Sequence, residues 1–439
     1  MEKTSGSYRN SFILVTVLFF LWGFITVLVD SLIPRLRELF TLSYFEAGLV
    51  QFAFFGAYFL LSIPAGYMLS KIGYKKGIIL GLLTMGLGCL LFYPAASFRT
   101  FGIFILAYFV LAGGMTILQV AANPYVSVLG DEAGASSRLN LSQAFNSLGT
   151  AIAPAVGALF ILSSSVKSSE EIAQLSDAAR ESYYATEAAA VQTPFIGLAI
   201  FIAIIAVVFA FARLPKIINE KSEGTYKQAL QTKSLPWGVL GIFFYVGAEV
   251  AIGSYLINYF LDLQVIDSIR GSSGMMDFAN FIATIFNKSL AGADDKAILG
   301  IFVICYWSGA MVGRFIGSYL TRIIQPAKVL TLFALLAISA IFISVMSTGL
   351  IAMWSILAVG LFNSIMFPTI FTTAIDGLGD LKPKASGLLC TAIVGGAVIP
   401  PLYGLCTDMV GFKTALLLVM ACYSYIVFYG WRISKTKAV

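Results

Sequence analysis

The stretch that decides the fold is Gly66-Tyr-Met-Leu-Ser-Lys-Ile72, which returns in altered form as Gly317-Ser-Tyr-Leu-Thr-Arg-Ile323. The first copy follows the second long apolar run of the chain, and the second copy follows the eighth. A second pair, Ala135-Ser136 and Ala385-Ser386, is separated by nearly the same distance of about 250 residues. Because both pairs occur in the same order, the two halves of the chain are predicted to be structural repeats.

The composition places these repeats in a membrane. The chain has 439 residues, of which 59% are hydrophobic and 11% are charged, and its mean hydropathy is +0.89. Soluble domains carry roughly 25% charged residues, so most of this protein's surface is expected to face lipid. The net charge of +6 is spread along the chain and does not indicate a nucleic-acid partner.

Apolar runs of about 20 residues, the length of a helix that crosses a bilayer, predict the fold class: an all-α membrane protein with twelve transmembrane helices in two halves of six. The helices are expected near residues 11–33, 44–69, 76–95, 101–128, 138–163, 194–213, 236–261, 298–323, 327–347, 350–375, 385–408 and 412–432. The predicted divisions are an N-terminal half, 1–213, a flexible linker, 214–235, and a C-terminal half, 236–439.

The distribution of positive charge predicts the orientation. If the N-terminus lies inside, most of the 28 Lys and Arg residues fall in inner segments. Such segments stay in the cytoplasm, so both termini and the linker are predicted to be cytoplasmic. The segment 164–193 is expected to be an outer loop. The outer insert 262–297 contains an apolar stretch, 275–286, which predicts a short helix.

Several chemistries are excluded by what the sequence lacks. It contains no histidine, which removes Ser-His and Cys-His catalysis and histidine metal sites. The five cysteines lie in apolar runs without a CxxC pair and are expected to be core residues. No G-x-x-x-x-G-K-[ST] motif is present, so ATP hydrolysis is not expected. A membrane-embedded enzyme is therefore disfavoured, and no cofactor is expected.

The segment 66–76 resembles the loop 2–3 signature of the major facilitator superfamily, G-x-L-a-D-r-x-G-r-k, except that Ser70 stands where that family usually has Asp. Four further stretches resemble the fucose–proton symporter family, and within it the bacterial glucose/galactose transporter branch. They are Leu18-Phe-Phe-Leu-Trp-Gly23, Gln119-Val-Ala-Ala-Asn-Pro-Tyr125, Arg138-Leu-Asn-Leu-Ser-Gln-Ala-Phe-Asn146 and Asn363-Ser-Ile-Met-Phe-Pro-Thr-Ile370.

This resemblance covers nearly the whole chain. It implies a monomeric carrier in the bacterial inner membrane that couples a cation to the uptake of a neutral hexose, such as glucose or galactose, by alternating access. In the fucose branch a carboxylate occupies the position of Gln119, so that branch's coupling scheme does not transfer to this chain. The alternatives are another sugar (mannose, fructose, N-acetylglucosamine or fucose) and a sugar sensor that does not transport.

Two acids lie deep in apolar runs, Asp30 in the first and Glu249 in the seventh. Arg138 and Arg314 are expected near inner helix ends, so no Lys or Arg is expected at the depth of the two acids. An unpaired charge in the bilayer is costly, so each acid is expected to take up a proton, bind a metal cation or accept sugar hydroxyls. The alternative is a structural hydrogen bond between helices.

We expect Asp30 to couple the cation and Glu249 to bind sugar. A carboxylate among neutral oxygens suits sodium, since hard cations prefer oxygen ligands, while a desolvated carboxylate can instead carry a proton. Because the resemblance includes sodium-dependent transporters, it inclines the prediction towards sodium at Asp30.

Side-chain amides are the other candidates for sugar binding, because each offers both a donor and an acceptor to hydroxyl groups. Two pairs share a helical face at i, i+3 or i, i+4 spacing, and two aromatic residues offer a flat apolar face. The candidates are Gln119, Asn123, Gln143, Asn146, Asn258, Asn363, Tyr255 and Trp307. The alternative role for the amides is to hold neighbouring helices together.

Overall fold

The computed structural model describes residues 2–39, 44–160, 174–215, 224–285, 289–290 and 292–436. Over these ranges the chain forms α-helices and short 3₁₀ turns and no strand. Ten helices within the described residues are long and apolar enough to cross a membrane. The fold is therefore all-helical, as predicted.

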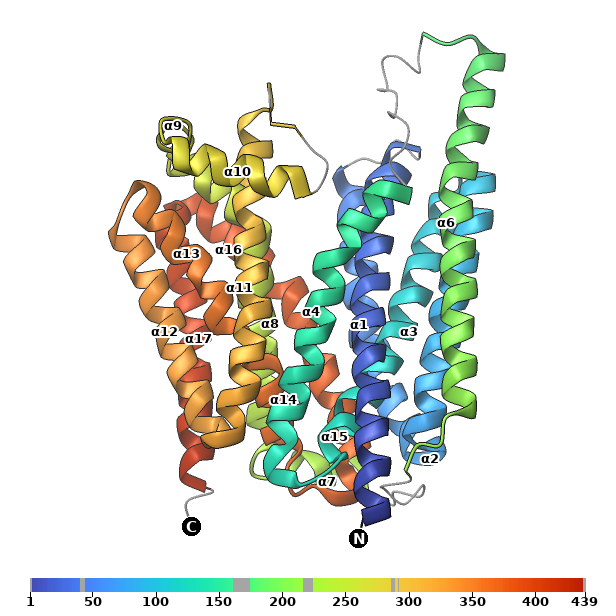
Figure 1. The fold of residues 1–439 in the computed structure, drawn as a ribbon, viewed down its shortest axis with the longest axis vertical. Coiled ribbons are helices and arrows are strands. Elements are labelled where there is room, and N and C mark those ends of the chain that lie inside the picture. The colour runs from blue at the N-terminus through green and yellow to red at the C-terminus, as the bar shows by residue number, and fades with distance from the viewer. Residues whose placement is uncertain are drawn as a thin grey trace.

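Figure 1 shows the helices in two groups. The N-terminal group contains α1 (Glu2–Leu39), α2 (Tyr44–Phe98), α3 (Phe101–Val128), α4 (Ala135–Phe160) and α6 (Asp177–Phe211). The C-terminal group contains α8 (Leu235–Asp262), α11 (Asp295–Ile323), α12 (Pro326–Met346), α13 (Gly349–Asn363), α14 (Met366–Ile375), α15 (Lys382–Thr391), α16 (Gly395–Val410) and α17 (Phe412–Thr436).

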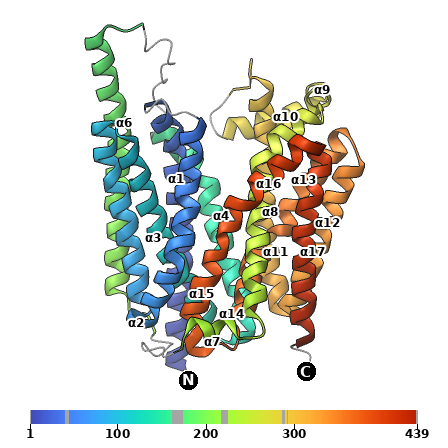
Figure 2. The same cartoon turned by 180° about the vertical axis from the view of Figure 1, so that it is seen from behind.

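Shorter elements lie at the two ends of the bundle: α7 (Tyr226–Leu230), α9 (Val265–Arg270), α10 (Ser273–Ile285) and the 3₁₀ turns η1 (Glu132–Gly134) and η2 (Gly379–Leu381). A third 3₁₀ turn, η3 (Ala392–Val394), joins α15 to α16 and packs against α8 and α2. Both chain ends lie at the same end as α7 and α15, and the two groups of helices diverge towards the other end (Figures 1 and 2). We call the end that carries α7 the α7 end.

Glycine and proline produce the breaks within the long helices. Gly73 interrupts α2 with φ 79° and ψ 168°, a conformation that only glycine adopts without strain. The predicted helix 350–375 is divided into α13 and α14 just ahead of Pro368. Proline has no N–H and its ring crowds the carbonyl four residues earlier, which here belongs to Ser364.

Two sequence predictions about helix ends were wrong. The last helix of the N-terminal group begins at Asp177, capped by Ser176, and not near residue 194. Its first turns are polar but rich in alanine, which favours helix without favouring lipid. Helix α1 likewise extends beyond 11–33 in both directions. The short helix predicted at 275–286 in the outer insert is confirmed as α10, and a further short helix, α9, precedes it.

The linker is more ordered than a flexible connection, although its residues 216–223 lie outside the described residues. Thr225 and Gln228 form a capping box at the start of α7, with bonds of 3.2 and 2.7 Å. The Tyr226 hydroxyl donates to the Ile63 carbonyl of α2. Burial raises the pKa of Tyr226 to about 12, so this hydroxyl stays protonated as a donor.

Polar contacts join the two groups at the α7 end. The Ser136 and Thr372 hydroxyls lie 2.6 Å apart, Ser386 donates to the Val120 carbonyl at 2.8 Å, and the Ser137 hydroxyl donates to the Ser318 carbonyl at 2.7 Å. An ion pair between Lys382 and Glu132, 3.3 Å long, lies close by. The structure is therefore closed at this end.

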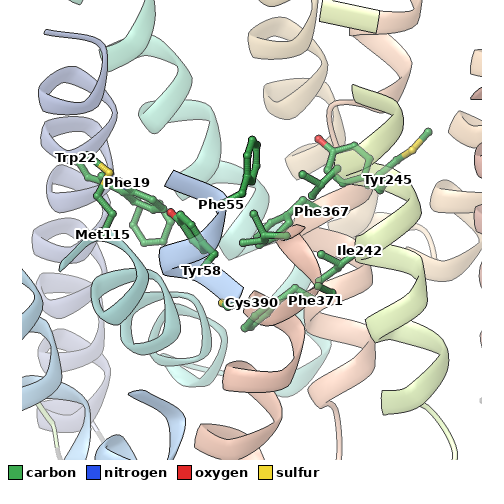
Figure 3. Packing of buried hydrophobic residues seen from close by; sticks show 14 of the residues in the cluster. Phe19, Trp22, Phe55, Tyr58, Met115, Ile242, Tyr245, Phe367, Phe371 and Cys390 are labelled. Carbon is green, nitrogen blue, oxygen red and sulfur yellow. The ribbon is translucent and has the colours of Figure 1, made fainter. Parts of the chain in front are cut away.

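Small and aromatic residues complete this closure. A Cβ on Gly66 of α2 would lie 3.1 Å from the Gly387 Cα of α15, so the two helices cross at a distance that only small residues permit. Further from the α7 end, Phe55 of α2 packs against Gly396 of the C-terminal group, where a Cβ would lie 2.5 Å from its ring. Figure 3 shows Phe55 between the aromatic residues of the two groups.

Candidate functional site

Three amides of the N-terminal group are buried and without hydrogen-bond partners. Gln119 is 8% exposed and Gln143 is 6% exposed, and within the described residues neither amide forms a hydrogen bond. Asn123 is fully buried, and both of its amide atoms lack a partner. A buried unpaired polar group costs about 1–3 kcal/mol, so these side chains carry hydrogen-bonding capacity that the described part of the fold does not use.

Asn146, on the same helix as Gln143, is partly used by the fold. Its amide nitrogen donates to the Phe19 carbonyl of α1 at 2.9 Å. A Cβ on Gly23 would lie 2.8 Å from that nitrogen, so glycine is required where α1 crosses α4. Asn146 therefore fixes α1 against α4 with its nitrogen and leaves its oxygen available.

Asp30 lies within α1, but its side chain falls outside the described residues. Its assignment as the cation-coupling residue stays a prediction from the sequence.

The polar residues of the C-terminal group form a different arrangement, which we call the tyrosine cluster: Tyr245, Glu249, Tyr306, Asn363 and Tyr423. Asn363 is fully buried, and its nitrogen contacts the Tyr306 hydroxyl at 2.6 Å and the Tyr423 hydroxyl at 3.3 Å. Glu249 follows Tyr245 by one helical turn on α8, and the Glu249 Oε1 and the Tyr245 hydroxyl are buried without a hydrogen-bond partner among the described residues. The C-terminal group therefore also contains a buried polar interior.

Arg314 of α11, which the sequence places near an inner helix end, bonds both groups of helices. Its Nε donates to the Ser364 carbonyl at 3.2 Å, and its guanidinium also donates to the Ser147 hydroxyl of α4. The Ser364 carbonyl is the one that Pro368 cannot bond. The long side chain and this free carbonyl together bring the guanidinium into the interior.

The remaining candidates lie elsewhere on α8 and α11. Tyr255 stacks obliquely on Tyr403 with ring centres 5.2 Å apart. Trp307 is 48% exposed and lies against Gly253, where a Cβ would be 2.8 Å from its ring. Asn258 is exposed. None of the contacts in the described part of the chain joins these three residues to the amides of α3 and α4.

The sequence also did not single out Phe55 and Tyr58, which lie with Phe19, Trp22 and Met115 in the apolar layer of Figure 3. The chain has many aromatic residues, and the sequence feature that could have indicated Phe55 is Gly396, which makes room for its ring. A separate cavity of about 400 Å³ lies between the groups at the α7 end, where Glu132, Ser136 and Thr372 contribute to its lining. It is on the closed side, away from the unpaired amides.

The fold and these buried amides define a class: a helical membrane protein that accommodates a polar solute between its helices, which is a transporter and not an enzyme. The chain belongs to the Major Facilitator Superfamily, which it matches over residues 11–401.

Full-length relatives support this membership. The chain is 46% identical to a glucose/galactose transporter of Brucella abortus, over 99% of this chain and 97% of the relative. It is 33% identical to the L-fucose-proton symporter of Escherichia coli, over 99% and 96% of the two chains. The crystal structure of FucP in the outward conformation superposes with a TM-score of 0.85 at 31% identity, covering 97% of this chain and 99% of that one.

Proposed function

We propose that this protein imports a neutral hexose, glucose or galactose, across the bacterial inner membrane by proton symport. The observation that carries the proposal is the set of unpaired amides on α3 and α4, because a neutral sugar offers the hydroxyls that these groups lack. The names of the glucose/galactose relatives support the substrate, and the names of the fucose relatives specify a proton. We therefore favour a proton over the sodium ion that the sequence suggested.

The proposed architecture has twelve spanning helices in two repeats of six. The long α2 contains two spans because Gly73 divides it, and α4, whose first half is polar, supplies one more. Equivalent positions of the repeat make related crossings: Gly66 of α2 lies against Gly387 of α15, and Ser318 of α11, next to Gly317, accepts a hydrogen bond from Ser137 of α4 at its carbonyl. This supports two related halves around a central site.

The α7 end is the cytoplasmic end in this proposal, since Lys and Arg are concentrated there and positive segments remain inside. Because this end is closed, the structure corresponds to a carrier open to the outside. Both termini and the linker are then cytoplasmic. We propose that the carrier works as a monomer and needs no cofactor besides the coupling ion.

The sugar is proposed to bond Gln119, Asn123, Gln143 and Asn146 on its N-terminal side. Tyr255, Asn258 and Trp307 are proposed to contact it from the C-terminal group. Asp30 is proposed as the coupling acid. Asn363 and Glu249, which lie in the tyrosine cluster, are proposed to act on the C-terminal group itself and not on the sugar.

Transport by the purified protein in sealed lipid vesicles tests the function. A pH gradient, acidic outside, should drive accumulation of labelled glucose or galactose, and vesicles without protein provide the control. A sodium gradient at equal pH should drive none. Accumulation with sodium alone would replace the proton by sodium, and absence of both accumulation and exchange would overturn sugar transport.

A further inference from the structure

Two basic side chains near the end of α17 lie over tryptophan rings at the α7 end of the molecule. The Arg432 guanidinium carbon lies 4.7 Å from the centre of the Trp237 ring of α8, and the Lys435 ammonium nitrogen lies 4.1 Å from the centre of the Trp431 ring. The chain has five tryptophans, and two of them occur in this one place. We call these four residues the tryptophan–cation seam, because they lie where α8 packs on α17 (Figure 2).

Residues of α17 hold the Trp237 ring in place. The Tyr425 hydroxyl donates to the Trp237 carbonyl at 3.1 Å, and the Phe428 ring packs edge-on against the Trp237 ring with centres 5.6 Å apart. Tyr425, Phe428 and Arg432 follow one another at spacings of three and four residues, so they share one side of α17. The surface that Arg432 contacts is therefore formed by the packing of the two helices.

The exposed face of α17 changes from apolar to charged at the seam. Phe428 is 39% exposed and Trp431 is 50% exposed, and on a helix long enough to cross a membrane such apolar side chains face lipid. Lys435 follows Trp431 by one turn and is exposed. Tryptophan gathers at the level of lipid head groups, because its ring is apolar and its N–H is polar. The seam therefore lies at head-group level, with Phe428 on the side of the lipid chains.

The two cations have no anionic partner in the described part of the chain. Neither Arg432 nor Lys435 forms an ion pair there. Helices α17 and α12 contain no acid, and the first acid of α8, Glu249, comes twelve residues after Trp237, roughly 18 Å along the helix. A guanidinium has five N–H donors and an ammonium has three. The seam thus offers positive charge and donors without a matching acceptor.

We propose that the tryptophan–cation seam binds the phosphate group of an anionic phospholipid in the leaflet at the α7 end. Phosphate oxygens accept from both cations, and the net charge of the lipid compensates the seam, whereas a zwitterionic lipid brings an ammonium group of its own. The exposed rings of Trp431 and Phe428 favour a lipid over a soluble phosphate compound, because they offer apolar surface to acyl chains. The site does not involve the sugar and does not depend on the transport proposed above.

Fluorescence of the seam tryptophans tests the proposal. With Trp307→Phe and Trp354→Phe, the tryptophans that remain are Trp237, Trp431 and the buried Trp22. The protein is placed in phosphatidylcholine vesicles that contain graded fractions of brominated phosphatidylglycerol or brominated phosphatidylcholine, since bromine quenches indole fluorescence. Phosphatidylglycerol should bind about tenfold or more tightly than phosphatidylcholine, because each basic residue near an anionic head group contributes roughly a factor of five.

Arg432→Gln with Lys435→Gln should remove this preference, so that both brominated lipids quench equally. Arg432→Lys with Lys435→Arg keeps both charges and should keep most of the preference. Lys71→Gln with Lys76→Gln is the matched control: it removes two positive charges from α2, in the N-terminal group, and should leave the preference unchanged.

Equal quenching by the two lipids in the parent protein overturns the proposal, and so does a preference that survives Arg432→Gln with Lys435→Gln. A control variant that loses the preference to the same extent also overturns it, because the charges would then attract lipid as a general field and not as a site. Thermal unfolding in detergent gives a second reading with all five tryptophans in place. Added phosphatidylglycerol should raise the melting temperature more than phosphatidylcholine does, and the variant without the two cations should lose this difference. Sugar uptake is measured separately, and its absence would not affect either result.

Discussion

The two groups of helices bury polar residues in opposite ways. In the N-terminal group, Gln119, Asn123 and Gln143 are buried with amides that bond nothing in the described residues. In the C-terminal group, Asn363 contacts two tyrosine hydroxyls and Arg314 bonds both a free carbonyl and the other group. The three N-terminal amides are thus wholly open, whereas the C-terminal group pairs the Asn363 nitrogen and leaves the Asn363 Oδ1, the Glu249 Oε1 and the Tyr245 hydroxyl without a partner in the described residues.

This difference teaches how to divide polar residues in a membrane interior into those that bind a ligand and those that maintain the fold. An unpaired buried amide is costly in the empty protein, and a ligand that pairs it recovers that cost on binding. A paired amide gains nothing from a ligand, because a bond must break before another forms. The N-terminal group is therefore expected to determine sugar affinity, and the C-terminal group to determine stability and charge.

Substitutions of the two acids are expected to have the largest effect on transport. Asp30→Asn removes the proposed coupling charge at nearly constant volume, so uphill accumulation of sugar should be abolished while exchange of internal for external sugar continues. Glu249→Gln should lower accumulation without abolishing it, since Asp30 is still present. Both reactions are measured in the same vesicles. Accumulation by Asp30→Asn would remove Asp30 from the coupling role, and loss of exchange would make it a sugar ligand or a structural contact.

Gln119→Ala and Gln143→Ala test the open amides. Each should weaken sugar binding by about 1–3 kcal/mol, because sugar hydroxyls lose a partner in a site shielded from water. The melting temperature of the empty protein should not fall, because neither amide bonds another residue in the described part of the chain. Equilibrium binding of labelled sugar and thermal unfolding measure the two quantities. Unchanged affinity in both variants would assign these amides to helix packing.

Asn363→Ala tests the paired amide and should show the reverse pattern. It leaves the Tyr306 and Tyr423 hydroxyls without their bond in a fully buried place, which should reduce stability by about 1–3 kcal/mol. Sugar affinity of the folded protein should be nearly unchanged. The same two assays apply. A large loss of affinity with unchanged melting would place Asn363 in the sugar site and end the distinction between the groups.

Hydropathy predicted the all-helical membrane fold well, because the bilayer requires long apolar helices. It did not locate helix ends that extend beyond the lipid. The first turns of α6 are polar and alanine-rich, so helix propensity determines them and hydropathy does not report them. The helix α7 depends on a capping box and on the Ile63 carbonyl, which comes close only in the folded chain.

The candidate site shows the same limit. The sequence indicated which amides lie in apolar runs, but not which of them find partners. Asn123 and Asn363 look alike in the sequence, each a short distance before a proline, yet one is unpaired and the other bonds two tyrosines from α11 and α17. The sequence indicates only where the Arg314 Cα lies along its helix. The direction of its side chain depends on the Ser364 carbonyl, which Pro368 cannot bond and which accepts from the Arg314 Nε.

Substitution of Asn146 should have the smallest effect, because its amide nitrogen is paired within the fold while its amide oxygen remains open. Its nitrogen donates to the Phe19 carbonyl, which already belongs to the helical ladder of α1, so Asn146→Ala strands no buried group on that side. The loss of stability should be about 0.5–1 kcal/mol, and the loss of sugar affinity should be similar, because one oxygen remains for the sugar.

Ser142→Ala is the matched control. It removes a neighbouring contact of 3.1 Å with Thr16, also between α4 and α1, and should reduce stability by a comparable amount without changing sugar affinity. If Asn146→Ala lowers stability alone, as Ser142→Ala does, Asn146 belongs with the paired residues. If it lowers affinity as strongly as Gln119→Ala, its bond to Phe19 contributes little, and Asn146 belongs with the open amides of the N-terminal group.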